Sequence, residues 1–225
     1  MNCYERTDHG VLLLVVLTLV PAVFLCTLWP ACVFGAEKTV LELWSEVSVP
    51  SVPKLQTIKA DPKTTALLIL DIEERTTNIK RRPRAVASVP AIEKLLARAR
   101  GKGMPVVFST TPKASPKEIL SQVAPRKDEP VVKSSVDKFF MTNLDEILRT
   151  KGIDSVIIVG TAAEGAVLHT ATAAAMRSLN VIVPVDGISS SELYAEQYVC
   201  WHLLNAPGSR NRTTLTRTDM IEISP

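Results

Sequence analysis

The stretch DSVIIVGTAAEGAVLHTATAAAMRSLN, residues 154–180, decides the fold of this chain. Residues 156–159 form a continuous apolar run rich in β-branched side chains, which is typical of a strand covered on both faces in a parallel sheet. Gly160 ends this strand, and residues 161–165 have little side-chain bulk before a long helix begins. A ligand could therefore approach the free N–H groups where the helix starts. An ordinary strand-to-helix connection explains the same local pattern.

The rest of the chain repeats this alternation of strand and helix. Ser88 is expected to cap a helix whose apolar positions follow helical spacing and which ends at Gly101. The alternation predicts an α/β fold, a doubly wound, mostly parallel six-stranded sheet with helices on both faces. The other strands are expected at residues 65–72, 105–110, 131–133, 181–185 and 213–223, and the other helices at residues 142–151 and 191–204.

The N-terminal part of the chain differs in composition from the rest. Residues 11–36 carry no charged side chain and are numerous enough to cross a bilayer. We expect a signal peptide or an uncleaved membrane anchor at residues 1–36, which implies an exported, periplasmic or membrane-anchored protein. Residues 37–64, with three prolines, predict an extended arm, and a plain linker is an equal alternative. The folded domain is expected at residues 65–225.

Composition excludes several classes of site. The net charge of +3 gives no reason to expect a nucleic-acid partner. Beyond residue 36 the chain has His169, His202 and a single cysteine, Cys200, so a zinc site of several His and Cys ligands and an internal disulfide are both excluded there. We expect no metal and no other cofactor.

Two features follow the first strong strand. Asp71 lies at the carboxyl end of the apolar run 65–72, where open α/β sheets bind their ligands. It is either a site residue or a cap of the following turn. Residues 73–84 are rich in arginine and lysine. A solvated basic loop, an anion-binding patch and a membrane-facing patch are all compatible with that pattern.

Three motifs occur in a fixed order along the chain. The first is TALLILDIE, which contains Asp71. The second is KSSVDKFFMTNLDEIL, in which Lys133 precedes Phe139 by six residues and Thr142 opens a Thr-x-Leu start of a helix, whereas Lys138 does not fit this spacing. The third is VGTAAEGAVLHTATAAA, followed by VIVPVDGISS. Together they resemble the isochorismatase-like hydrolases, or cysteine hydrolase superfamily, which includes nicotinamidases, carbamoylsarcosine amidohydrolases and isochorismatases.

The resemblance implies roles for residues at matching positions. Asp71 takes the place of the catalytic aspartate and Lys133 that of the catalytic lysine, while Ala166 stands at the position of the nucleophilic cysteine. A cis peptide at Thr161–Ala162 is typical of the family, and it implies the backbone N–H groups of Ala162 and Ala166 as oxyanion donors.

The resemblance also suggests substrate contacts and marks departures from the family. Arg75 lies four residues beyond Asp71, where family members often contact substrate, although an exposed loop arginine is the simpler interpretation. Phe139 and Glu164 are further candidates for substrate binding. The Asp-x-His metal motif of nicotinamidases is absent, and residues 109–112 (STTP) stand in its place.

Alanine cannot act as a nucleophile, so cysteine-dependent amide hydrolysis at this position is excluded. Isochorismatases hydrolyse a vinyl ether with an acid and a water molecule, and they provide the nearest precedent for a hydrolase using Asp71 and Lys133. The alternatives are an inactive protein that binds a small molecule, and a Cys-to-Ala form of an amidase. In each case we expect a small-molecule ligand, a homo-oligomer, and membrane contact only through the N-terminal segment.

Overall fold

The computed structural model describes residues 38–225. The chain divides into two compact units, Met1–Ser48 and Val49–Pro225, and the first contains the short 3-10 helix η1 (Trp44–Glu46). The segment expected to be a signal peptide or anchor, residues 1–36, lies outside the described residues. Across residues 38–225, no helix has the length and apolar character needed to span a membrane.

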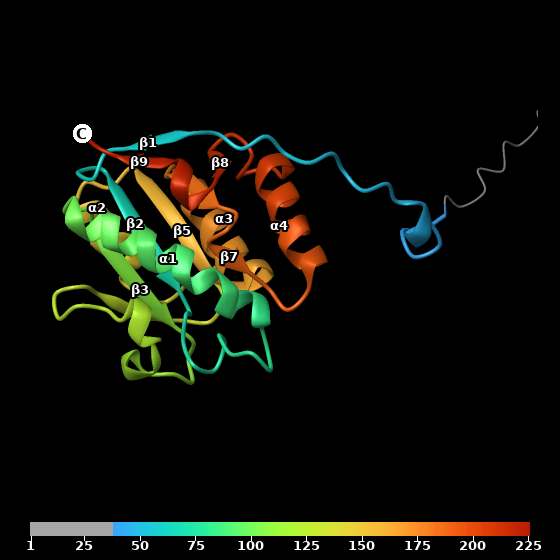
Figure 1. Cartoon of the computed structure of the whole chain (residues 1–225). Helices are drawn as coiled ribbons and strands as arrows, with labels where there is room; N and C mark the ends of the chain where they lie inside the picture. Colours follow the sequence, from blue (N-terminus) through green and yellow to red (C-terminus); the bar gives the residue numbers. More distant parts are fainter. Residues whose placement is uncertain (1–37) are drawn as a thin grey trace, which may run out of the picture. The chain divides into compact units, whose positions relative to one another are not determined.

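The second unit is built on the predicted parallel sheet. Its strands follow the order β4-β3-β2-β5-β6-β8, every neighbouring pair is parallel, and a short strand β7 (Ile188–Ser189) pairs with the end of β5. The prediction of a doubly wound, mostly parallel sheet is confirmed, with β7 added to the six expected strands (Figure 1). The six are β2 (Thr65–Leu70), β3 (Val106–Thr110), β4 (Val131–Lys133), β5 (Ser155–Thr161), β6 (Asn180–Pro184) and β8 (Thr213–Thr216).

Alternate side chains of the central strands separate the core into two layers. Leu67 and Ile69 of β2 join the core cluster beneath α1 (Pro83–Gly101) on one face of the sheet. Leu68 and Leu70 join the cluster beneath the helices of the other face. This alternation is the two-residue period of a strand buried on both sides. The helices of the second face are α2 (Leu144–Thr150), α3 (Leu168–Met176) and α4 (Leu193–Asn205).

Helix α1 begins earlier than predicted. Ser88 was expected as its N-cap, but the helix starts at Pro83, and Ser88 is buried inside it with its hydroxyl donating to the carbonyl of Ala85 at 2.9 Å. Pro90 therefore lies in the helix interior, which ordinarily costs about 3 kcal/mol. The buried side of the helix continues back to Ala85, so burial rather than the local Ser-Val-Pro pattern decides where the helix begins.

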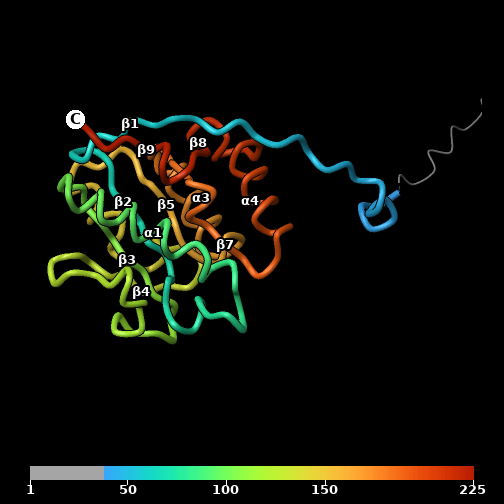
Figure 2. Tube along the Cα trace, viewed as in Figure 1, coloured from blue at the N-terminus to red at the C-terminus, as the bar shows by residue number. Residues whose placement is uncertain are grey.

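The end of the chain also differs from expectation. The strand expected at residues 213–223 is two strands, β8 and β9 (Ile221–Ile223), separated by the short helix η5 (Thr218–Met220). Strand β9 leaves the main sheet and pairs in parallel with β1 (Ile58–Ala60), at the upper margin of the trace in Figure 2. Two further short helices, η2 (Pro116–Glu118) and η3 (Ser121–Val123), lie in the connection from β3 to β4.

Gly160 permits the close contact between the two central strands. It has φ +138°, and a Cβ atom added there would lie 2.1 Å from the carbonyl oxygen of Leu70, its register partner on β2. We expect Gly160→Ala to lower the free energy of unfolding by at least about 2 kcal/mol, because both the backbone conformation and the space exclude a side chain. Urea denaturation measures this loss.

The matched control is Gly101→Ala. Nothing lies within 4 Å of a Cβ added at Gly101, the last residue of α1. The free energy of unfolding of the Gly101→Ala variant should stay within about 0.5 kcal/mol of the wild-type value, or rise above it. Equal stability of the two variants would contradict the close contact at Gly160.

Candidate active site

Asp71 lies at the centre of the candidate site. It follows β2 in a left-handed conformation (φ 54°), at the carboxyl end of the sheet. Its Oδ2 atom accepts a hydrogen bond from Nζ of Lys138 at 2.8 Å, and its Oδ1 atom accepts one from the Ser109 hydroxyl at 2.7 Å. The side chain of Lys138 is fully buried and that of Asp71 is 6% exposed, so this ion pair is shielded from solvent.

The expected Asp71–Lys133 pair is not formed. Lys133 ends strand β4 with an exposed side chain on the wall of a surface cavity of about 640 Å³. Beyond β4 the chain turns back, and the Ser134 hydroxyl donates to the carbonyls of Asp137 and Phe140. This turn, rather than the strand, places Lys138 beside Asp71.

The Lys138 ammonium group has three acceptors. Besides Asp71, its Nζ atom donates to the carbonyl of Ser134 at 3.0 Å and to that of Ser135 at 2.5 Å. Its backbone N–H donates to the Thr170 hydroxyl on α3 at 3.1 Å. A lysine ammonium has three protons to donate, so this one is fully satisfied and held in place. Sequence spacing missed Lys138, and the only local signal was a lysine directly before the buried Phe139.

The surroundings of Asp71 change its acidity. Burial raises the pKa of the Asp71 carboxyl above its ordinary value, although Lys138 and Ser109 both favour the carboxylate. The charge of Glu73 acts in the same direction as burial. Glu73 itself is completely buried, and it accepts hydrogen bonds from the N–H and the hydroxyl of Thr111 at 3.1 and 2.6 Å. The sequence did not single out Glu73.

The small-residue turn after β5 has the predicted backbone. The peptide bond Thr161–Ala162 is cis, as expected from the resemblance, and a single π-helical turn, η4 (Ala163–Val167), precedes α3. Ala166 is buried at 3% exposure, and Ala162 is half-buried. The role of their N–H groups as oxyanion donors stays a prediction.

The hydroxyl groups near this turn are already engaged. Thr161 donates to the carbonyl of Ser189 at 3.0 Å, and Thr170 lies 3.3 Å from the carbonyl of Val136. A hydroxyl that donates to a main-chain carbonyl lacks the adjacent base that would activate it as a nucleophile. Neither threonine therefore replaces the missing cysteine.

The loop that carries Lys138, the turn η4 and the start of α1 lie close to Asp71. A Cβ atom added at Gly165 would lie 3.6 Å from a methyl group of Val136, so the turn touches the loop that carries Lys138. The guanidinium of Arg82 lies just before α1. The negative charges of Glu164 and Asp71 both act to raise its pKa. Burial, followed by the charge of Arg81, lowers the pKa of Arg82. Its Nε atom is buried without a hydrogen-bond partner among the described residues.

The other predicted residues are separated by the fold. Phe139 lies in the core at 5% exposure, with the Arg177 guanidinium 4.4 Å from its ring centroid. Arg75 and Glu164 are exposed, and Arg75 lines a second cavity of about 360 Å³. Substrate contact by any of the three stays a prediction.

Cys200 on α4 is unsuited to nucleophilic chemistry. It is half-buried, and burial raises the pKa of its thiol to about 11, so the thiolate is rare at neutral pH. In the part of the chain that the structure describes, no group of three or more His, Cys, Asp or Glu side chains is placed to hold a metal ion.

The difference between the two lysines can be tested directly. Lys138→Met would leave the Asp71 carboxylate buried without a cation, and we expect a loss of about 3–5 kcal/mol in the free energy of unfolding at pH 7. Lys133→Met, the matched control, should change it by less than about 0.5 kcal/mol. Urea denaturation measures both.

The pH dependence of this loss has a defined sign. Because the pKa of Asp71 is raised in the folded state, the native chain binds more protons than the unfolded chain, and the contribution of Asp71 to stability increases as pH falls through that pKa. Lys138→Met removes a cation that lowers the pKa of Asp71, so the unpaired carboxyl of the variant is protonated at higher pH and the deficit should shrink on acidification. A larger loss in Lys133→Met, or a deficit that grows on acidification, would contradict the assignment.

Comparison with solved structures agrees with the fold. An isochorismatase family protein from Desulfovibrio vulgaris superposes with a TM-score of 0.62 at 22% identity, covering 69% of this chain and 95% of that one. N-carbamoylsarcosine amidase from Thermoplasma acidophilum superposes with a TM-score of 0.61 at 25% identity, covering 72% and 99%. The nicotinamidase of Staphylococcus aureus gives 0.57 at 21% identity, covering 65% and 95%.

Sequence comparison extends the likeness beyond the fold. The secreted isochorismatase effector Isc1 of Verticillium dahliae is 33% identical over 118 residues, which is 48% of this chain and 62% of the effector. The match thus spans less than two thirds of that relative. The model of the isochorismatase domain matches residues 65–214, about two thirds of the chain. The chain therefore belongs to the isochorismatase family of hydrolases.

Proposed function

We propose that this protein hydrolyses a small molecule by acid–base catalysis from Asp71, assisted by Lys138 and a water molecule, without a cysteine nucleophile. The observation that carries the proposal is the buried Asp71–Lys138 pair at the carboxyl end of the sheet, next to a turn that holds no thiol. Hydrolysis of a vinyl ether is the nearest precedent, because that reaction needs a proton donor and water and no protein nucleophile.

The proposed reaction begins with proton transfer. The protonated Asp71 carboxyl gives its proton to the vinyl carbon, and the positive charge that results is shared with the ether oxygen. Burial, which raises the pKa of Asp71, increases the fraction of carboxyl groups that hold a proton. Lys138 and Ser109 then stabilise the carboxylate that remains, through the hydrogen bonds they already make.

Water completes the reaction. A water molecule adds to the electron-poor carbon, and the Asp71 carboxylate takes one of its protons. The resulting hemiketal breaks its C–O bond to give an alcohol and a carbonyl product. Asp71 thus acts first as acid and then as base, water is the only co-reactant, and the Ala162 and Ala166 N–H groups are the proposed donors to oxygen atoms of the substrate.

Export of the protein is also proposed. The support is the uncharged run at residues 11–36 and the word "secreted" in the name of the related Verticillium dahliae effector. Detection of the chain outside the cell, or in the membrane fraction, would distinguish a cleaved signal from an anchor.

Turnover tests the acid role of Asp71. We expect isochorismate to be hydrolysed by the wild type and by Lys133→Met, and Asp71→Asn to lose at least about 100-fold in kcat/KM, since general acid–base catalysis contributes about 10²–10⁴-fold. The value of kcat/KM should fall as pH rises through the raised pKa of Asp71, because the acid must be protonated. In Ser109→Ala the fall of kcat/KM should occur at higher pH, since the variant loses a hydrogen bond that favours the Asp71 carboxylate.

Two outcomes would count against the proposal. A folded wild type that binds isochorismate without turnover would support the inactive binding protein. An Asp71→Asn variant as active as the wild type would remove Asp71 from the chemistry.

The position of the missing nucleophile has its own test. Ala166→Cys would place a thiol in the turn next to the buried Asp71–Lys138 pair, and we expect it to gain hydrolysis of a small amide such as nicotinamide. Ala163→Cys is the matched control, because Ala163 is a buried alanine of the same turn. Both are made with Cys200→Ser, and ammonia release is measured. Equal rates in the two variants would show that position 166 is not the nucleophile position.

A further inference from the structure

A second cavity lies beside the candidate active site and carries an unbalanced charge. Its volume is about 360 Å³, within the range of small-molecule sites. Three of its lining residues are basic and none is acidic. The lining consists of Arg75, Thr76, Arg81, Thr111, Pro112 and Lys113.

This cavity shares its walls with the site of Asp71. The hydroxyl of Thr76, on one wall, donates to the backbone carbonyl of Asp71. Thr111, on the other wall, holds the Glu73 carboxylate and follows Ser109, the hydrogen-bond partner of Asp71, by two residues. A ligand in the cavity would therefore lie against the two chain segments that position the Asp71 carboxyl group.

Three of the nearby carboxylates bind groups other than the basic side chains of the cavity. Glu73 is completely buried against Thr111, and Asp71 is paired with Lys138. Glu118, in the adjacent connection, accepts the N–H of Ser115 at 2.8 Å. Glu74 is exposed and is absent from the lining. Among the described residues, none of these acids forms an ion pair with a basic side chain of the cavity lining.

The basic side chains themselves are available to a ligand. Nη1 of Arg81 donates to the carbonyl of Arg75 at 3.1 Å, which fixes one end of its guanidinium and leaves its other N–H groups free. Arg75 and Lys113 form no side-chain hydrogen bond or ion pair with any residue in the range 38–225. Arg82, next in the chain, extends the positive charge toward Asp71.

We propose that this cavity binds the carboxylate of a small organic acid, so that the substrate of the proposed hydrolase is an anion. The inference rests on the proposed function for the identity of the ligand as substrate. Guanidinium groups match the planar geometry of a carboxylate and can bind it with two hydrogen bonds, and a lysine adds a third charge-assisted donor. The space favours a small molecule over a polymer.

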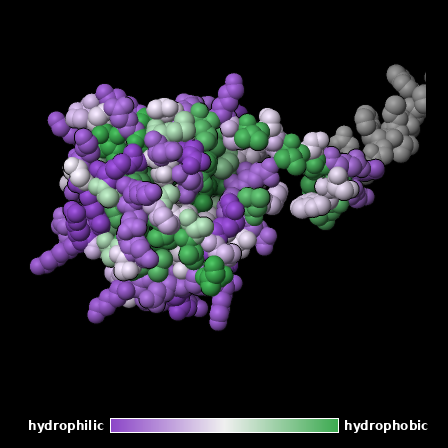
Figure 3. Space-filling model, viewed as in Figure 1, coloured by the Kyte–Doolittle hydropathy of each residue, from purple (hydrophilic) through white to green (hydrophobic). Residues whose placement is uncertain are grey.

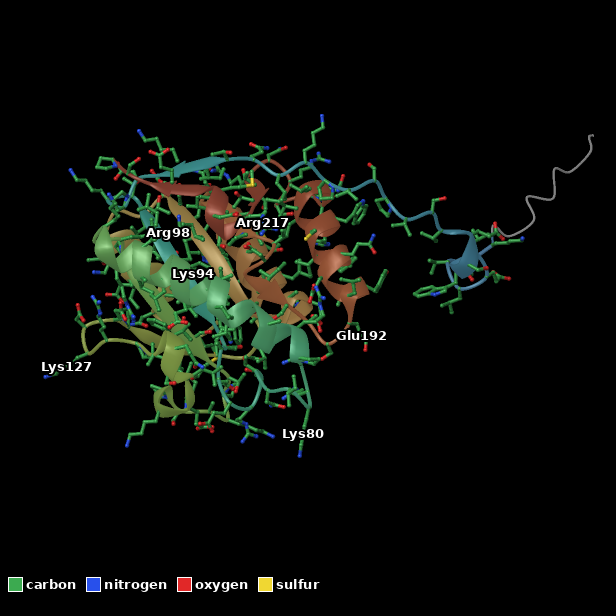
Figure 4. All side chains as sticks on the ribbon, viewed as in Figure 1. Lys80, Lys94, Arg98, Lys127, Glu192 and Arg217 are labelled. Carbon is green, nitrogen blue, oxygen red and sulfur yellow. The ribbon has the colours of Figure 1, made fainter. Side chains whose placement is uncertain are left out.

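Other basic side chains of the same region serve as a control. Hydrophilic side chains gather along the lower margin of Figure 3, where Figure 1 draws the loops that follow β2 and β3. Lys80 and Lys127 are exposed, point away from the body of the molecule in Figure 4, and are absent from the cavity lining. Removing both changes the net charge as much as removing Arg75 and Lys113.

The experiment compares two probes that differ in charge and hardly in shape. Benzoate and benzamide are titrated into the full chain, and binding is followed by ligand-observed NMR. We expect benzoate to bind about tenfold more tightly than benzamide at low salt, which corresponds to about one charge-assisted hydrogen bond. Added NaCl should weaken benzoate alone. The double variant Arg75→Gln/Lys113→Gln should lose the preference, and Lys80→Gln/Lys127→Gln should keep it.

The outcomes separate this proposal from the proposed function. Benzoate cannot be hydrolysed, so its binding is independent of turnover, and the expected pattern in a chain without isochorismate hydrolysis would sustain the anion site alone. Equal binding of both probes, binding of neither, or equal loss in both double variants would overturn the proposal. So would a loss of binding to vesicles of phosphatidylserine in Arg75→Gln/Lys113→Gln with no loss of benzoate binding, because it would assign the charges to a membrane surface. Circular dichroism confirms that each variant is folded.

Discussion

The buried ion pair between Asp71 and Lys138 is the interaction on which the site depends. Removing two charges from water costs several kcal/mol each, and the pair is tolerable only because every remaining donor and acceptor is satisfied. Ser109 satisfies the second oxygen of Asp71, and the carbonyls of Ser134 and Ser135 satisfy the ammonium group. The end of β2, the end of β3 and the loop after β4 are thereby tied to one point. Loss of Lys138 would leave the Asp71 charge unpaired in the interior, and loss of Ser109 would remove one of the hydrogen bonds that stabilise it.

The parallel sheet explains why these parts meet. Strands β2, β3 and β5 run side by side in the same direction, so their carboxyl ends lie at one edge, where Asp71, Ser109 and the turn after Thr161 follow one another in space. Gly160 allows β5 to approach β2 closely at that edge, since no side chain intervenes. Helix α3 then begins directly beyond the turn and anchors the loop of Lys138 through Thr170. The topology of the sheet therefore determines where the site lies, and the segments that follow the strands supply its charged side chains, Asp71 and Lys138.

This division also explains what could be predicted from the sequence. Continuous apolar runs identify strands buried on both faces, so the sheet, the position of Asp71 and the turn after Gly160 were accessible. Lys138 was not, because a spacing rule counts residues along the chain, whereas the turn at Ser134 decides which lysine points inward. Ser88 was misplaced as a cap because Pro90 is a strong local signal, and only the tertiary burial of Ala85 shows that the helix continues through it. Arg82 and Glu73 were not singled out within the basic stretch 73–84 and the first motif, since their environment comes from residues distant in sequence.

The basic cavity and the acid role of Asp71 are physically connected. The charge of Arg82 interacts with that of Asp71 and favours the carboxylate, whereas a general acid must hold a proton. An anionic substrate bound at the cavity would cancel part of that positive charge and place a negative charge near the carboxyl group. Both changes raise the pKa of Asp71 further, in the same direction as burial. Binding of the substrate would thus prepare the acid that acts on it, and a neutral molecule of the same shape would bind without this effect. On this argument, selectivity for anions would appear in the chemical step as well as in binding.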